Sequence, residues 1–178
     1  MIRAMPSRAS YSTWTMGGAY TRAVATQDEQ GGRHRLDVAV RWGHCDPAGI
    51  VYYPVYYDFF HQAMETWFDR VLGVPYRSVI ETRRIGFPSV HTEADYHAPS
   101  TYGDRLCVML AVSAMGRTSL TFALSIEGPD GGLRVSGRKT VVAMDLDPAS
   151  PTFRRAIPIP DDVRGRIEAF GIAPAAPA

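Results

Sequence analysis

The chain has 178 residues, which is enough for a single domain with a sizeable core. Its 19 basic and 18 acidic side chains leave a formal net charge of +1, so the composition gives no electrostatic footprint for nucleic acid or an acidic partner. Two cysteines, Cys45 and Cys107, are too few for a disulfide scaffold and are not spaced as zinc ligands. We therefore expect a reducing, cytoplasmic setting and no bound metal.

The two ends of the chain have compositions that are unlike its middle. Residues 1–33 are rich in Ser, Thr, Gly and Ala without a sustained period, which predicts a flexible extension. After Ile172 only Ala and Pro occur, so we expect 172–178 to be a disordered tail and 34–171 to be one domain. No apolar run resembles a signal peptide or approaches membrane-spanning length, so we expect no membrane partner.

A strand and a long amphipathic helix are the first predicted elements. Residues 36–42 alternate imperfectly between apolar and polar, which indicates a strand. Pro54 is a helix-start residue, and Gly73 followed by Pro75 ends the helix. The apolar residues between them recur at steps of three and four and form one broad face: Tyr56, Phe59, Phe60, Ala63, Met64, Trp67, Phe68, Val71 and Leu72.

The second half of the chain is typical of an antiparallel sheet. Four strands are predicted at about 85–97, 104–114, 118–127 and 133–145, with turns at 115–117 and 128–132. One long helix followed by a run of long strands indicates an α+β fold, in which a curved antiparallel sheet wraps around the helix.

Residues 46–54, with the sequence DPAGIVYYP, join the first strand to this helix. They place the carboxylate of Asp46 close to the helix N-terminus, among small and proline residues that allow close approach of a ligand. A helix N-terminal amide can stabilise an oxyanion, and a carboxylate can attack a carbonyl or activate water. An aspartate before proline is most often a turn or capping residue. The complete segment, however, favours acyl chemistry.

The segment DPAGIVYYP resembles the motif of hot-dog-fold acyl-CoA thioesterases of the 4-hydroxybenzoyl-CoA thioesterase type. The resemblance runs from about Val38 to Asp162 and includes Tyr96 and the stretch from Gly103 to Leu106. It implies a single hot-dog domain that hydrolyses an acyl-CoA thioester, aromatic acyl groups included, to the free acid and coenzyme A without a cofactor.

The resemblance also implies roles for individual residues. Asp46 corresponds to the catalytic carboxylate, as nucleophile or general base, and the backbone N–H of Tyr53 corresponds to the group that polarises the carbonyl. Arg117, after the hairpin bend, is the best match for a contact to the nucleotide end of coenzyme A. His61 stands where the family has an acid that contacts the aryl hydroxyl, so the acyl specificity stays open.

Other readings of the same segment compete with this one. Gly49 and Tyr52 are expected to contact substrate, whereas His44 and Cys45 would have to converge from alternating faces to bind a metal, so packing is the simpler role. Glu65 is the rival catalytic acid. Paired with His61 it would suit a dehydratase-like protein, and a module that binds acyl-carrier protein is a further alternative.

Self-association is expected from the predicted sheet. A single sheet around one helix leaves open edge strands, and the polar helix face with His61, Gln62 and Glu65 has no covering element. The resemblance implies a homodimer, or a dimer of dimers that forms a homotetramer. In such an assembly the acyl pocket lies between subunits, so Arg117 can come from the partner of the chain that supplies Asp46.

Overall fold

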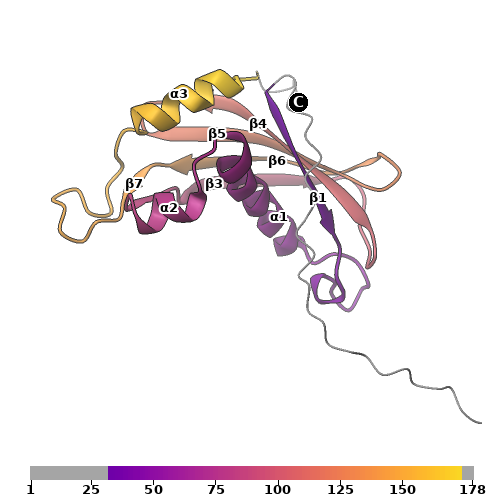
Figure 1. The fold of residues 1–178 in the computed structure, drawn as a ribbon. Coiled ribbons are helices and arrows are strands. Elements are labelled where there is room, and N and C mark those ends of the chain that lie inside the picture. Colours follow the sequence, from indigo (N-terminus) through magenta and orange to yellow (C-terminus); the bar gives the residue numbers. More distant parts are fainter. Residues whose placement is uncertain (1–31, 174–178) are drawn as a thin grey trace, which may run out of the picture.

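The computed structural model describes residues 32–173, and Figure 1 shows their arrangement. Almost all of the predicted extension and tail, 1–31 and 174–178, therefore lies outside the described residues. The elements, in chain order, are β1 (Arg33–Ala39), the 3-10 turn η1 (Trp42–His44), α1 (Tyr53–Thr66), the π-helical η2 (Trp67–Val71), α2 (Tyr76–Glu81), β2 (Ile85–Gly86), β3 (Ser89–Tyr96), β4 (Arg105–Met115), β5 (Ser119–Glu127), β6 (Leu133–Val142), β7 (Met144–Asp145) and α3 (Asp161–Phe170).

The main sheet has five antiparallel strands in the order β1-β4-β5-β6-β3. The sheet is curved, and α1 lies across its inner face while α2 and α3 lie toward one end (Figure 1). β2 and β7 form a separate two-stranded pair. This arrangement confirms the predicted α+β order of one long helix wrapped by an antiparallel sheet.

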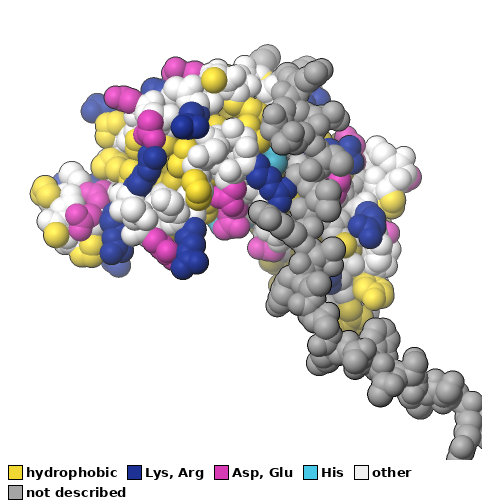
Figure 2. Space-filling view, viewed as in Figure 1, with side chains coloured by type: hydrophobic (Ala, Val, Ile, Leu, Met, Phe, Trp, Pro, Cys, Tyr) yellow, Lys and Arg dark blue, Asp and Glu magenta, His cyan; other side chains and the backbone are white. Residues whose placement is uncertain are grey.

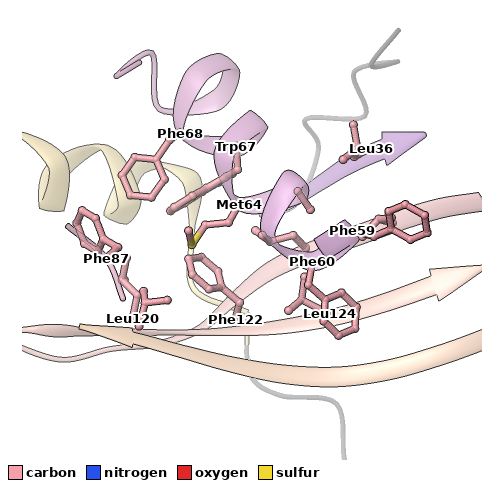
Figure 3. Close-up of a cluster of buried hydrophobic side chains, with 14 of the residues drawn as sticks. Leu36, Phe59, Phe60, Met64, Trp67, Phe68, Phe87, Leu120, Phe122 and Leu124 are labelled. Atoms are coloured by element: carbon pink, nitrogen blue, oxygen red, sulfur yellow. The ribbon is translucent and has the colours of Figure 1, made fainter. Parts of the chain in front are cut away.

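The core forms where the apolar face of α1 and η2 meets the inner face of the sheet (Figure 3). The helical face predicted from the spacing is buried, with only Val71 partly exposed. Trp67 packs edge to face on Phe122 of β5 and on Phe68, with ring centroids 5.4 and 5.2 Å apart. Aromatic pairs of this geometry add to the apolar area that they bury.

Two predicted strands are interrupted in the structure. The strand predicted at 85–97 breaks between β2 and β3, at Phe87 and Pro88, because proline has no N–H for the ladder. The strand predicted at 133–145 breaks at Ala143, whose N–H donates to Thr118 O at 2.8 Å. The short helices α2 and α3 were not predicted. α3 carries Gly165 in its middle, which weakens its helical signal.

The described ends of the chain both lie along β4. Arg33, which we expected in the extension, is the first residue of β1 and pairs with Ala111. Ile172, which we expected in the tail, forms a parallel bridge with Val112, and Ala173 N donates to Val112 O at 2.9 Å. Arg33 and Ile172 therefore take part in the sheet, one residue beyond each boundary drawn from composition.

Candidate active site

The loop between η1 and α1 folds into a tight turn around Asp46. Its ends are joined by an antiparallel bridge between Cys45 and Val51. Asp46 N donates to Ile50 O at 3.0 Å, and Gly49 N donates to Asp46 O at 2.9 Å. Gly49 has a φ of +78°, a conformation that favours glycine. The predicted substrate contact Gly49 is thus a residue that shapes the turn.

This turn is fastened to the rest of the domain by its backbone. Val51 N donates to Ser100 O at 2.9 Å, and Ile50 forms a bridge with Thr101. Tyr52 N donates to His44 O at 2.9 Å, which holds the residues before and after the turn side by side. Asp46 is therefore presented at the N-terminal end of α1, as the sequence predicted.

The carboxylate of Asp46 has one oriented oxygen and one available oxygen. Asp46 is partly buried, and its Oδ1 accepts a hydrogen bond from Ala48 N at 2.8 Å. Within residues 32–173 no donor is bonded to Oδ2. A carboxylate held by one oxygen can use the other for attack or for proton transfer.

The first amide of α1 is available as a donor. The N-cap residue Tyr52 makes no side-chain capping bond, and the N–H of Tyr53 has no acceptor in the part of the chain that the structure describes. Pro54, the next residue, has no N–H. The positive end of the helix dipole therefore presents a free donor at Tyr53, beside the turn that carries Asp46.

Exposed aromatic rings surround this helix start. The side chains of Tyr52 and Tyr53 are 49% and 57% exposed and meet edge to face, with centroids 5.1 Å apart. Tyr96, at the end of β3, packs on Tyr56 at 5.8 Å. Partial desolvation by its neighbours, with a hydrogen bond to Tyr57, raises the pKa of Tyr96 to about 12. The position of Tyr52 is compatible with the substrate contact predicted for it.

His44 and Cys45 have packing contacts of their own. His44 Nδ1 accepts a hydrogen bond from Arg41 N at 3.1 Å, and its ring meets Phe59 edge to face at 5.4 Å. Burial lowers the pKa of His44, which favours the neutral imidazole. Cys45 packs against the core. Within residues 32–173, no group of three His, Cys, Asp or Glu side chains is arranged to hold a metal ion.

His61 lies farther along α1 and has both ring nitrogens engaged. Its Nε2 is 3.2 Å from Glu65 Oε1, and its Nδ1 is 3.2 Å from Nζ of Lys139 on β6. Its ring also meets Tyr76 of α2 edge to face at 6.0 Å. Burial and then the Lys139 charge lower the pKa of His61. The structure thus joins the predicted pair of His61 and Glu65 to a third group.

Lys139 was missed by the sequence reasoning. It occupies an inward position of β6, between the apolar positions Val135, Gly137 and Val141 of the same face. A single charged residue in that period-two pattern was the signal that could have identified it, because inward positions of a covered sheet are normally apolar.

Arg117 lies far from Asp46 within one chain. It is exposed in the turn between β4 and β5, where its backbone O accepts from Ile159 N at 2.9 Å. The Asp46 turn follows Val40, whose N donates to Asp104 O at the opposite end of β4. An 11-residue strand separates the two ends, on the order of 30 Å. The structure does not bring Arg117 to Asp46 in the same subunit.

Comparison with known proteins identifies relatives along most of this domain. The family model of the thioesterase-like superfamily matches residues 40–167. A 1,4-dihydroxy-2-naphthoyl-CoA hydrolase from Synechococcus elongatus is 38% identical over 85 residues, which are 47% of this chain and 62% of the relative. A 4-hydroxybenzoyl-CoA thioesterase from Pseudomonas sp. is 31% identical over 81 residues, 45% of this chain and 57% of the relative. These alignments span about three fifths of the relatives' length.

This chain superposes on nearly the whole length of several solved structures that have the same architecture. The 4-hydroxybenzoyl-CoA thioesterase from Pseudomonas sp. superposes with a TM-score of 0.68 and 27% identity, covering 76% of this chain and 99% of that one. A gentisyl-coenzyme A thioesterase superposes with a TM-score of 0.67 and 26% identity, covering 75% and 98%. These neighbours confirm the predicted hot-dog fold. With the family match over 40–167, they show that this chain belongs to the thioesterase-like superfamily.

Proposed function

We propose that this protein hydrolyses an acyl-CoA thioester to the free acid and coenzyme A. The observation that carries the proposal is the Asp46 turn at the start of α1, where, among residues 32–173, neither Oδ2 of Asp46 nor the N–H of Tyr53 has a hydrogen-bond partner. Membership of the thioesterase-like superfamily supports it. So do relatives and structural neighbours that are named for hydrolysis of CoA thioesters.

In the proposed reaction the thioester carbonyl oxygen accepts a hydrogen bond from the N–H of Tyr53. This bond stabilises the negative charge that develops on that oxygen. Asp46 then acts in one of two ways. It attacks the carbonyl carbon, expels the coenzyme A thiolate and leaves a mixed anhydride that water hydrolyses. Alternatively, it takes a proton from a water that attacks the carbon, and the tetrahedral intermediate expels the thiolate. Both routes use only water and these groups, with no cofactor.

Substrate contacts are proposed at the helix start and along its length. Gly49 and Tyr52 border the reacting carbonyl, His61 lies toward the acyl end, and Arg117 pairs with phosphate at the nucleotide end. The large separation of Arg117 from Asp46 along β4 supports a contribution of Arg117 from a second subunit. Names of relatives that act on hydroxynaphthoyl and hydroxybenzoyl thioesters support an aromatic acyl group.

The assembly is proposed to be a homodimer, or a homotetramer built as a dimer of dimers, with sites shared between subunits. β3 is at the edge of the sheet, and its side chains Val90 and Tyr96 are 61% and 49% exposed. An exposed edge strand with apolar side chains is a surface that pairing covers. The free thiols of Cys45 and Cys107 support a cytoplasmic location. No helix among residues 32–173 has the length and apolarity needed to cross a bilayer.

The charges on one face of the domain are mixed (Figure 2). On the face that carries α2 and α3, acidic and basic side chains are interspersed. A mixed surface of this kind lacks the single-sign field that attracts nucleic acid. This face therefore gives no support for a nucleic-acid partner, and the proposed partner is the coenzyme A thioester that the family match supports.

Free-thiol release from a panel of acyl-CoA thioesters tests the proposal. Asp46→Asn keeps the shape of the side chain and removes its charge, so we expect kcat to fall by roughly two or more orders of magnitude while KM changes less. Glu65→Gln is the parallel variant, because it neutralises the rival candidate carboxylate in the last turn of α1. Near-normal turnover in Asp46→Asn together with an inactive Glu65→Gln would transfer the catalytic role to Glu65.

A dehydratase-like activity is the second candidate, favoured by the 3.2 Å contact between His61 and Glu65. A histidine paired with an acid can move protons to and from a hydroxyacyl thioester. His61 has no spare ring nitrogen, however, since Nδ1 faces the Lys139 ammonium. Interconversion of 3-hydroxyacyl and enoyl thioesters without thiol release would favour this candidate. Binding of a loaded acyl-carrier protein with neither reaction would favour a carrier-binding module.

A further inference from the structure

Lys139 is a charged side chain in the interior of the domain. It is 4% exposed and points from β6 to the inner side of the sheet. Its neighbours across the sheet are Phe122 on β5 and Thr92 on the edge strand β3. Burial of a charged group carries a large free-energy cost unless partners compensate for the lost water.

The first compensation is a chain of hydrogen bonds to a carboxylate. An ammonium can only donate, so the 3.2 Å contact from Lys139 Nζ makes Nδ1 of His61 the acceptor. The proton of a neutral His61 then lies on Nε2, which donates to Glu65 Oε1 at 3.2 Å. Through a neutral imidazole, the positive charge of Lys139 is therefore balanced by the negative charge of Glu65.

The second compensation is incomplete. A lysine ammonium has three N–H donors, and one of them is used on His61. Among residues 32–173 no second acceptor is bonded to Lys139. A buried donor without an acceptor costs about 1–3 kcal/mol, so such donors normally have a partner. Lys139 thus has capacity for an oxygen that is not supplied by the described chain.

The ammonium of Lys139 contacts His61, which lies on the same face of α1 as the proposed reaction centre but farther from the helix N-terminus. Tyr53, Tyr57 and His61 follow one another at steps of four, which places them on one helix face. His61 is eight residues beyond Tyr53, about 12 Å along the axis, and helix side chains lean back toward the N-terminus. An acyl group of one or two rings covers such a distance only together with the hydrogen bonds of about 3 Å at its two ends.

This cluster is open to solvent at its helix side. The side chains of His61 and Glu65 are 42% and 45% exposed. Glu65 also lines a groove of about 270 Å³ with Tyr76 and Ile80 of α2. The groove itself lies on the α2 side of Glu65, so the partly exposed side chains of His61 and Glu65 are the side from which a ligand along α1 would approach the ammonium.

We propose that Lys139 is the group that selects the acyl part of the substrate, by donating a hydrogen bond to an acceptor oxygen at the far end of the acyl group. The inference rests on the proposed thioesterase function and deepens it. His61, whose nitrogens are both engaged, positions the ammonium instead of contacting the substrate oxygen. Because Glu65 already balances the charge, a neutral hydroxyl or carbonyl oxygen is a sufficient ligand.

The test compares two substrates that differ by one oxygen, an unsubstituted aryl-CoA and the same aryl-CoA with a ring hydroxyl. We expect the wild-type protein to prefer the hydroxylated thioester in kcat/KM by about tenfold or more, as one hydrogen bond to a charged donor provides. Lys139→Met should lose this preference, because kcat/KM should fall more for the hydroxylated thioester than for the unsubstituted one. The control is Arg138→Met, a neighbour on the outer face of β6 that is 54% exposed.

Contrary outcomes are distinguishable. Retention of the preference in Lys139→Met overturns the inference, and so does an equal loss for both substrates. If an equal loss accompanies a halved mass in light scattering, the spare donors serve a subunit contact instead. If Lys139→Met does not fold, Lys139→Gln replaces it, since the shorter amide cannot reach the same oxygen and should lower the preference in the same direction.

Binding separates a failure of the inference from a failure of the proposed function. Calorimetry with non-hydrolysable thioether analogues of the two aryl-CoA compounds measures the preference without turnover. A wild-type protein that binds the hydroxylated analogue more tightly but releases no thiol from any thioester would retain the Lys139 site and refute the hydrolase. Equal binding of both analogues would refute the Lys139 site.

Discussion

Replacement of Tyr53 by proline isolates the backbone N–H that is proposed to polarise the thioester carbonyl. The native N–H has no acceptor among the described residues, so its removal breaks no internal hydrogen bond. Proline is favoured in the first turn of a helix because its φ is already helical. Tyr52, with φ −64° and ψ 126°, has the conformation that a residue before proline prefers. The substituted chain should therefore fold.

The expected effect is confined to catalysis. Loss of one oxyanion donor typically lowers kcat by about 10²–10³, equivalent to about 2.7–4 kcal/mol of transition-state stabilisation. The free energy of unfolding should change by less than about 1 kcal/mol, since the Tyr53 ring is 57% exposed. Tyr53→Ala is the matched control, because it removes the same ring and keeps the N–H.

The assay is free-thiol release under saturating acyl-CoA, with denaturant unfolding of each variant as the check on folding. Tyr53→Ala should retain most of the wild-type kcat, and Tyr53→Pro should fall below it by at least about 10². Equal kcat values in two folded variants would show that the Tyr53 N–H does not stabilise the transition state, and another donor would have to be found.

Two further predictions concern the assembly and acid stability. If Asp46 and Arg117 of one site come from different subunits, mixing Asp46→Asn with Arg117→Ala protein should restore part of the activity. The reason is that half of the sites in each mixed dimer then carry neither change. A mixture that stays inactive under conditions of subunit exchange would place both residues of a site on one chain. His34 is 6% exposed, bonded to Thr66 Oγ1 at 2.9 Å, and burial together with Arg70 lowers its pKa to about 4. The imidazole of His34 binds a proton near pH 6.5 in the unfolded chain but only near pH 4 in the folded chain. The free energy of unfolding should therefore fall by about 3 kcal/mol between pH 6.5 and pH 4 in denaturant titrations. If the free energy of unfolding changes equally with pH in His34→Leu, other groups cause the dependence.

The central helix and its buried face could be predicted from the sequence because their information is local. Apolar residues at steps of three and four define a face wherever the helix packs, and Phe59, Met64 and Trp67 are buried as predicted. The Asp46 turn was also predictable, since Gly49 and Pro54 constrain the backbone within a few residues of the carboxylate. Asp46 and the start of α1 could thus be named as a candidate site before any tertiary contact was known, whereas Lys139 was missed.

What the tertiary structure decided depends on pairing between distant segments. The break at Ala143 follows from its bond to Thr118, a residue 25 positions away, whereas the break at Pro88 has a local cause in the proline itself. The separation of Arg117 from Asp46 follows from the length of β4. His61 and Lys139 are 78 residues apart in sequence and 3.2 Å apart in space. The sequence pattern predicts on which face each side chain lies, but only the register of β6 against β5 and β3, and the placement of α1 across that sheet, determine which buried charge meets which partner.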